Sequence, residues 1–254
     1  NGTSLIPYQK DVLLNLVTCA LVIAGGIGFP VIFELPLKHF SWKRQSMHTR
    51  VVLSTTFALL LFGTLLLKLT ESISWLGAFF YSVSARTAGF STYNLSDFST
   101  AGLLVVSGLM FIGASPASTG GGIKTTTFFV LLSGIYSAAT NHSERAFHNA
   151  IPKDAFRKAS VISMLAVFLV MTASYLMLIF DPQLSLRDVL FEMISAFSTS
   201  GLSTGITPQL SAQSRILSII MMYIGRLGPL TVASLWYFTI GERVRYPEGT
   251  IAIG

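Results

Sequence analysis

The sequence predicts an all-α integral membrane protein made of repeated units of helix, short helix, loop and helix. Of its 254 residues, 52% are apolar and only 11% are charged, whereas soluble domains average about 25% charged residues. Long uncharged runs recur along the chain, and one glycine-containing hexad occurs twice at the same point of a similar unit. These features exclude a soluble enzyme and a disordered tail. A disulfide scaffold is excluded because Cys19 is the single cysteine.

Six apolar runs are long enough to cross a bilayer, which requires about 17–25 helical residues. They are residues 12–33, 51–67, 98–123, 125–141, 159–180 and 216–241. Two further apolar pieces, residues 73–85 and 189–198, correspond to helices of only about 15–20 Å. Pieces of that length are typical of re-entrant or buried helices. Each lies between two full spans, so the order helix, short helix, loop, helix occurs twice.

The positive charges predict the orientation in the membrane. Basic residues gather in alternate loops: Lys38, Lys43, Arg44 and Arg50 after the first span, Arg145, Lys153, Arg157 and Lys158 after the fourth, and Arg243 and Arg245 after the last. The loops that contain the short helices are poorer, with Arg86, Arg187 and Arg215. The positive-inside rule therefore places the basic loops in the cytoplasm. This distribution also argues against nucleic acid as the reason for the net charge of +6.

The repeated hexad has the pattern T-x-G-φ-S-T, where φ is an apolar residue. Its copies occupy residues 87–92 and 199–204, 112 positions apart, and each follows one of the short helices. Non-helical backbone at membrane depth is tolerated only where it is buried in protein or lines a water-filled cavity. Glycine lets such a segment turn its carbonyl groups toward an ion without a Cβ clash. The alternative is a helix-packing turn in which glycine merely permits close approach.

The chemistry of the hexad favours a dehydrated monovalent cation. Backbone carbonyl groups replace the hydration shell of potassium in selectivity filters, and neither hexad contains a carboxylate. We therefore expect K⁺ at the carbonyls of Thr87, Ala88, Gly89, Thr199, Ser200 and Gly201, with Phe90 and Leu202 completing the two filter segments. No catalytic residues, covalently bound cofactor or zinc motif are expected. An enzyme is improbable on this sequence.

A glycine-rich stretch interrupts the third and fourth apolar runs at about mid-membrane. Its notable residues are Gly113, Ser115, Pro116, Ser118, Thr119, Gly120, Gly121, Gly122 and Lys124. Proline removes a backbone donor and consecutive glycines disfavour helix, so the helix should break here. The stretch fails as a phosphate-binding loop because Ile123 separates the last glycine from Lys124 and no strand precedes it. We interpret it as a mobile plug, or gating loop, beneath the filter.

Arg226 is the single charge in the last apolar run. An arginine deep in a span costs about 2.5–3.5 kcal/mol even on the mildest scale. We expect its side chain to face the pore, where it sets an electrostatic barrier or contacts the glycine-rich loop. The alternative is a helix that begins later and places Arg226 near the membrane surface.

Several stretches carry a resemblance to a known family. They are residues 85–90, 113–116 and 118–127, with 225–231 in the last span and 25–30 in the first. On these motifs the chain resembles the Trk/Ktr/HKT superfamily of potassium transporters, most of all the KtrB-type membrane subunits of bacterial Ktr uptake systems. The resemblance runs essentially from end to end and implies a potassium-channel-like pore of four helix, pore helix, filter and helix repeats in one chain.

The resemblance assigns the parts of the chain to repeats. Residues 1–40 would supply the closing helix of an incomplete second repeat, 41–140 the third repeat with its gating loop, and 141–254 the fourth repeat with the arginine-bearing helix. Ser200 departs from the family pattern, where we expect an apolar residue. We expect little effect on selectivity because backbone carbonyls coordinate the ion.

The resemblance also implies partners and a location. These are a lipid bilayer, a second copy in a homodimer and a cytoplasmic, nucleotide-binding, KtrA-like regulatory subunit, in a bacterial plasma membrane. Potassium is the expected transported ion and sodium is a candidate activator. One alternative is a sodium-selective member of the same superfamily, which a serine in the first repeat, outside this chain, would indicate. The other is the membrane subunit of an ATP-driven pump, which needs a nucleotide domain on another chain.

Overall fold

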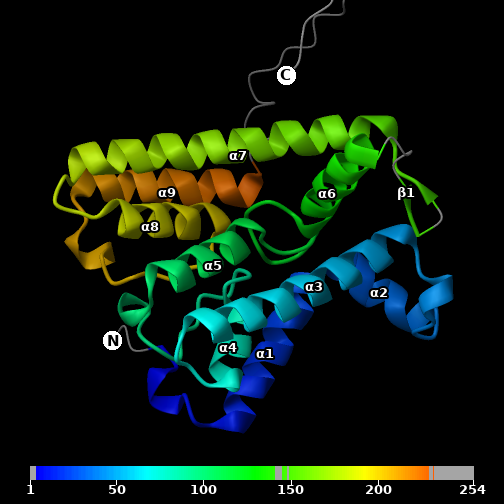
Figure 1. Ribbon diagram of the computed structural model, residues 1–254, viewed down its shortest axis with the longest axis horizontal. Helices are drawn as coiled ribbons and strands as arrows, with labels where there is room; N and C mark the ends of the chain where they lie inside the picture. Colours follow the sequence, from blue (N-terminus) through cyan, green and yellow to red (C-terminus); the bar gives the residue numbers. More distant parts are fainter. Residues whose placement is uncertain (1–3, 141–144, 148, 229–230, 232–254) are drawn as a thin grey trace, which may run out of the picture.

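The two longest described helices of the computed structural model are α3 (Met47–Thr70) and α7 (Lys153–Phe180); α7 lies along one edge and α3 crosses the middle (Figure 1). The structure describes residues 4–140, 145–147, 149–228 and 231. Within these ranges, α3 and residues 154–180 of α7 are long and apolar enough to span a bilayer on their own. The predicted all-α membrane class is confirmed by this architecture, in which the described strands are limited to the small hairpin of β1 (Arg145–Ala146) and β2 (Asn149–Ala150).

Each long helix begins the same series of elements. After α3 come α4 (Trp75–Ser84), a 3₁₀ turn (Leu95–Asp97) and α5 (Thr100–Phe111). After α7 come α8 (Leu186–Ser198), a 3₁₀ turn (Thr207–Gln209) and α9 (Ala212–Leu227). The two series are joined through the contact of α5 with α8. Their shared apolar cluster includes Tyr81 of α4, Met110 of α5 and Phe191 of α8, so the short helices are held by side chains from both series.

A carboxylate fastens the end of each long helix to the start of the last helix in its series. Glu71, which caps α3, accepts hydrogen bonds from the backbone N–H (2.9 Å) and hydroxyl (2.6 Å) of Ser99, the N-cap of α5. Asp181, which caps α7, accepts the same pair from Ser211, the N-cap of α9, at 3.1 and 3.0 Å. Each serine hydroxyl in turn accepts the N–H three residues later. One carboxylate thus fixes the mutual position of two helices.

Asp181→Ala is expected to lower the free energy of unfolding by about 1–3 kcal/mol, because two donors at the start of α9 lose a charged acceptor. Hydrogen bonds from Ser214 and Ser211 hold the pKa of Asp181 below its usual value. Its stabilising effect is therefore complete above the ordinary aspartate pKa near 4 and is lost as the pH falls further. Thermal unfolding of the full-length protein in detergent at pH 7 and at pH 3 measures both effects. Asp97→Asn is the matched control, since Asp97 is exposed, and an equal shift for both variants contradicts this role.

The predicted first span is wrong as a straight helix. Residues 12–33 divide into α1 (Val12–Ile27) and α2 (Phe29–Leu37), which meet at an angle of 95°. Gly28 has a φ of 92° at the corner, a conformation that favours glycine. Pro30 lies in the first turn of α2, where its missing N–H leaves no helical bond unmade. The run is uninterrupted by charged residues but broken in conformation.

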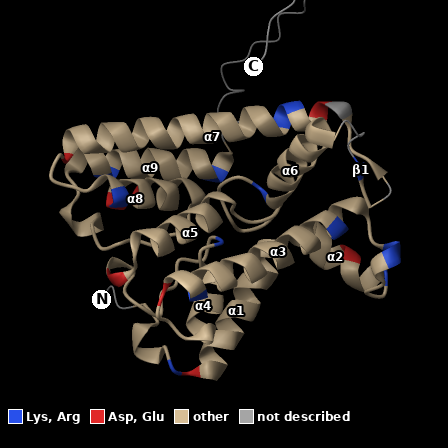
Figure 2. Ribbon diagram, viewed as in Figure 1, with Lys and Arg blue, Asp and Glu red and all other residues tan. Residues whose placement is uncertain are grey.

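The third apolar run ends where the glycine-rich stretch begins, as expected. Helix α5 ends at Phe111, and α6 (Thr125–Thr140) begins directly after the loop of residues 112–124. The charged residues gather at helix ends and in connecting segments (Figure 2).

The last helix, α9, begins earlier than expected and ends at Leu227, followed by Gly228 with a φ of 91°. The rest of the predicted span 216–241, apart from residue 231, lies outside the described residues, as do Arg243 and Arg245.

Candidate functional site

The two T-x-G segments leave the carboxyl ends of α4 and α8 in similar conformations. Each short helix begins at a serine N-cap, Ser74 or Ser185, whose hydroxyl accepts the backbone N–H three residues later. At the other end the chain enters positive φ twice, at Thr87 (81°) and Gly89 (76°) in one segment. It does so at Thr199 (53°) and Gly201 (87°) in the other. The carboxyl ends of both helices, which carry partial negative charge, therefore point into the segments.

The backbone N–H groups of the segments are directed back toward their helices. Ala88 donates to the Ser84 carbonyl at 3.0 Å, and Ser200 donates to the Ser195 carbonyl at 3.0 Å. In the part of the chain that the structure describes, by contrast, the carbonyl oxygens of six segment residues accept no hydrogen bond. These residues are Thr87, Ala88, Gly89, Thr199, Ser200 and Gly201. Backbone carbonyl oxygens without a hydrogen-bond donor are available to coordinate a cation.

The two segments lie side by side. A Cβ atom at Gly89 would be 2.1 Å from the Ser200 carbonyl oxygen, and the hydroxyl of Ser200 donates to the Ala85 carbonyl at 3.4 Å. The second contact gives Ser200, the departure from the family pattern, a structural role. The following apolar residues differ, because Phe90 is 43% exposed whereas Leu202 is 2% exposed within the core.

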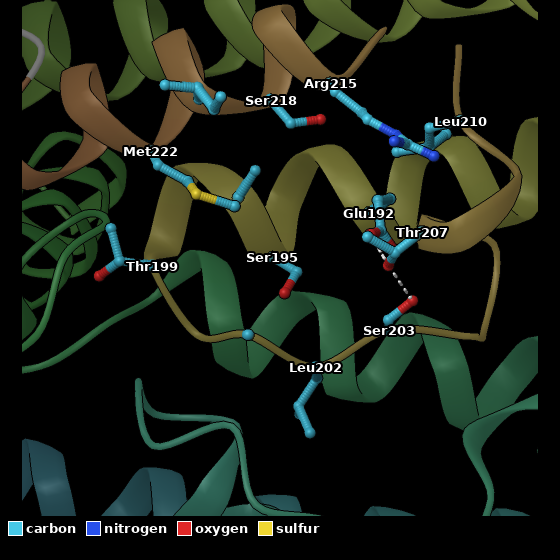
Figure 3. Close-up of a pocket in the computed structure, with 13 residues that line it drawn as sticks. Glu192, Ser195, Thr199, Leu202, Ser203, Thr207, Leu210, Arg215, Ser218 and Met222 are labelled. Atoms are coloured by element: carbon cyan, nitrogen blue, oxygen red, sulfur yellow. Dashed lines mark hydrogen bonds between the residues drawn. The ribbon is translucent and has the colours of Figure 1, made fainter. Parts of the chain in front are cut away.

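Two cavities adjoin the segments. One, of about 420 Å³, lies between their outer ends and is lined by Gly89, Ser91, Gly201 and Ser203, among others. The other, of about 410 Å³, lies between α8, α9 and the second segment. On its wall Thr207 donates a hydrogen bond to Glu192 at 2.5 Å, and Ser203 lies 2.9 Å from Thr207 (Figure 3). Glu192 is a carboxylate on the short helix that sequence reasoning did not single out.

The glycine-rich loop lies directly against the threonines that open both segments. The backbone N–H of Gly121 donates to the Thr199 hydroxyl at 3.2 Å. A Cβ atom at Gly120 would be 2.4 Å from the Thr87 hydroxyl, and one at Gly121 would be 2.7 Å from the Thr199 hydroxyl. Only glycine allows this approach, so consecutive glycines let the loop close against two segments at once.

Two cationic side chains bind carbonyl groups of this loop. Lys124 donates to the Gly120 carbonyl at 2.6 Å, and Arg226 donates to the Thr119 carbonyl. Arg226 lies in the last turn of α9, so the expectation that it sits deep within a longer helix is not met in the described residues. Its contact with the loop, in contrast, is the one expected.

The other side of the loop packs on the corner between α1 and α2. Ser115 N–H donates to the Gly26 carbonyl at 3.0 Å, and Thr119 N–H to the Gly25 carbonyl at 3.3 Å. A Cβ atom at Gly28 would be 2.4 Å from the Pro116 carbonyl oxygen. The sequence motif at residues 25–30 carries part of the family resemblance, as the close of a repeat. The structure adds that it receives the loop.

The remaining loop residues stabilise its own shape. Ser118 accepts the Gly120 N–H at 3.4 Å, and Ser115 lies 2.9 Å from the Thr125 hydroxyl. Gly122 has a φ of 71°. A Cβ atom at Gly113 would be 2.1 Å from the Gly121 carbonyl oxygen, so the two ends of the loop touch. Gly120 and Gly121 therefore lie beside the two segments, while Ser115, Pro116 and Thr119 join the stretch to the corner between α1 and α2.

Arg86, which the sequence places in a loop that contains a short helix, is buried. Its side chain is 6% exposed, and Nη2 lies 3.4 Å from the Gly113 carbonyl oxygen. The described residues contain no group of three or more His, Cys, Asp or Glu side chains placed to hold a metal ion. The oxygen atoms that accept hydrogen bonds at the tip of the loop belong to the Thr119 and Gly120 carbonyls and the Thr199 hydroxyl.

Comparison with known proteins gives a consistent result. Residues 47–239 match the family model TrkH, described as a cation transport protein. The chain is 35% identical over 272 residues to Ktr system potassium uptake protein D of Bacillus subtilis, covering 100% of this chain and 60% of the relative. It is also 35% identical over 271 residues to Ktr system potassium uptake protein B of Vibrio alginolyticus, covering 99% and 58%. The chain thus spans about 60% of the length of these curated relatives.

A solved structure has the same fold. The crystal structure of the potassium transporter TrkH from Vibrio parahaemolyticus superposes with a TM-score of 0.72 at 17% sequence identity. The match covers 89% of this chain and 52% of that one. At this identity the likeness establishes the architecture, and the site has to be argued from this chain's own residues.

Proposed function

Because this chain belongs to the TrkH family of cation transport proteins, we propose that it is part of a membrane subunit that conducts potassium ions down their electrochemical gradient. The ions pass in single file through a gated pore. The names of the Ktr relatives support uptake of potassium. The subunit is a multi-pass membrane protein and its family is one of transporters, not enzymes.

One observation carries the proposal. The six carbonyl oxygens of residues 87–89 and 199–201 accept no hydrogen bond from any described residue, and they lie at the carboxyl ends of two short helices. Oxygen atoms of this kind replace the water shell of potassium. Hydroxyl and carbonyl oxygens without a carboxylate suit a monovalent rather than a divalent cation.

The glycine-rich loop is the proposed gate. It contacts Thr87 and Thr199, the first residues of both filter segments, so it blocks an ion that leaves the filter on this side. Arg226 and Lys124 add positive charge beside it. Because only a few hydrogen bonds to its carbonyl groups hold the loop, a small free energy is enough to move it away from the filter.

We assign residues 41–140 to a third repeat and 141–254 to a fourth, with 1–40 closing a second. Three parallels support the assignment: the matching order of elements, the Glu71 and Asp181 anchors, and the similar corners at Gly28 and Gly228. The basic loops face the cytoplasm of a bacterial cell under this proposal. The Ktr names imply an uptake system with partners, and we propose on the resemblance alone that these are a second copy in a homodimer and a KtrA-like regulatory subunit, with sodium as a candidate activator.

The proposal is tested by potassium uptake in a bacterial strain that lacks its own uptake systems. Expression of the full-length protein that contains this chain is expected to restore growth at low external potassium. If the protein takes up sodium but no potassium in this strain, the sodium-selective alternative is favoured. Absence of uptake despite normal amounts in the membrane, with and without the regulatory subunit, contradicts the proposal.

A further inference from the structure

Arg86 is a buried cation between the proposed filter and the proposed gate. It follows α4 directly and precedes Thr87, the first residue of the third filter segment. Its Nη2 donates to the carbonyl of Gly113, the second residue after α5. Arg86 forms no ion pair with a described carboxylate, and its Nε has no hydrogen-bond partner among the described residues. The Gly113 carbonyl is therefore the hydrogen-bond acceptor of the Arg86 guanidinium.

The surroundings of Arg86 leave little room for water. A cavity of about 10 Å³ beside it is lined by Val22, Gly26, Thr56 and Leu60, among others, which is space for about one water molecule. The carboxyl end of α5, which carries partial negative charge, lies two residues before the Gly113 contact. Moving Gly113 away would leave a buried cation without its acceptor, which is costly in such a setting.

The fourth repeat shows that a filter segment does not itself require this arginine. At the position 112 residues later stands Ser198, whose hydroxyl donates to the Ser195 carbonyl of its own helix at 3.2 Å. The start of the loop, at Gly113, contacts Arg86, whereas Ser198 is approached by Gly121, where a Cβ atom would be 2.9 Å from the Ser198 carbonyl oxygen. The arginine thus occurs in the repeat whose segment adjoins the start of the loop.

The tip of the loop is held differently. Arg226, which donates to the Thr119 carbonyl, is exposed, and Lys124, which donates to the Gly120 carbonyl, is half-buried. Contacts in exposed positions break at lower cost than a buried charge-assisted hydrogen bond. The three cations therefore divide the loop into a fixed start at Gly113 and a releasable tip at residues 119–120.

We propose that Arg86 is a positioning residue that ties the start of the glycine-rich loop to the base of the third filter segment. The inference rests on the proposed function. When the gate opens, Gly113 stays in place and the tip leaves the filter threonines. The same bond keeps Thr87 in its positive-φ conformation, so loss of Arg86 disturbs the gate and the selectivity together.

Potassium and sodium uptake by the full-length transporter, reconstituted in proteoliposomes at matched protein amounts, tests this role. Arg86→Gln is expected to raise basal potassium flux and lower the potassium-to-sodium uptake ratio, each by about fivefold, the factor that corresponds to one lost hydrogen bond of about 1 kcal/mol. Arg86→Lys keeps the charge and is expected to give intermediate values. Arg187→Gln, which removes a more exposed arginine from α8, is expected to match the unaltered protein.

The outcomes separate this inference from the proposed function. Unaltered protein without potassium uptake contradicts the function itself. Uptake by the unaltered protein, with an unchanged flux and ion ratio in both Arg86 variants, overturns the positioning role. Lower flux at an unchanged ion ratio also overturns it, because that result indicates a structural contribution alone. If Arg86→Gln is not recovered in folded form, Arg86→Lys decides by the same criteria.

Discussion

Gly89→Ser is expected to reduce the potassium-to-sodium uptake ratio by at least about tenfold, more than Gly201→Ser does. Both glycines have positive φ, at 76° and 87°, so either substitution adds backbone strain of about 1–2 kcal/mol. A Cβ atom at Gly89 would also lie 2.1 Å from the Ser200 carbonyl oxygen, whereas at Gly201 the nearest atom is 4.0 Å away. The Ser200 carbonyl therefore has to move when residue 89 gains a side chain, and it is one of the proposed ion ligands.

Gly89→Ser and Gly201→Ser serve as matched controls for each other, because the same chemical change is made at equivalent positions of the two segments. Uptake of both ions by reconstituted full-length protein measures the effect. Alanine at each position separates the effect of Cβ from that of the added hydroxyl. Wild-type preference for potassium in both serine variants refutes the filter assignment, and a larger loss at Gly201 refutes the steric argument for Gly89.

Removal of residues 118–120 is expected to increase potassium flux by about tenfold or more while the preference for potassium is largely kept. The deletion takes away Thr119, whose carbonyl binds Arg226, and Gly120, which lies against the Thr87 hydroxyl. The filter segments and the Arg86 anchor at Gly113 are untouched. Each released contact corresponds to about 1 kcal/mol or a factor of about five in the open population.

Arg226→Gln provides a graded comparison for this deletion. It breaks the contact with Thr119 but leaves the loop at full length, so a smaller rise in flux is expected. Fluxes have to be compared at equal protein amounts in the proteoliposomes. An equal or lower flux after the deletion, in protein that is otherwise normally folded, is incompatible with a plug.

The broad architecture follows from composition and periodicity. Runs of about 20 apolar residues predict α3 and α7, and two short runs followed by T-x-G predict α4 and α8. The interruption between α5 and α6 follows from Pro116 and the three glycines at 120–122, because these residues disfavour helix wherever they occur. These features depend on neighbouring residues alone, so they can be recognised in a single sequence.

The misplaced elements depend on contacts that are remote in sequence. The corner at Gly28 lies in a stretch with three glycines and Pro30, so a break is compatible with its composition, but its angle depends on a contact with the Pro116 carbonyl from a loop about 90 residues later. The position of Arg86 between two apolar runs is evident in the sequence, but its acceptor at Gly113 is visible only in the fold. Glu192 and Asp181 were passed over for the same reason, since their partners, Thr207 and Ser211, lie on other elements.

The central claim is that this chain contributes two segments of a potassium filter to a passive, gated pore. Its most direct test is potassium flux into proteoliposomes that contain the purified full-length protein, with an imposed potassium gradient and no ATP. The account predicts potassium entry that follows the gradient, exceeds sodium entry and is reduced by Gly89→Ser. Entry that requires ATP, or that is equal for potassium and sodium in the unaltered protein, would contradict it.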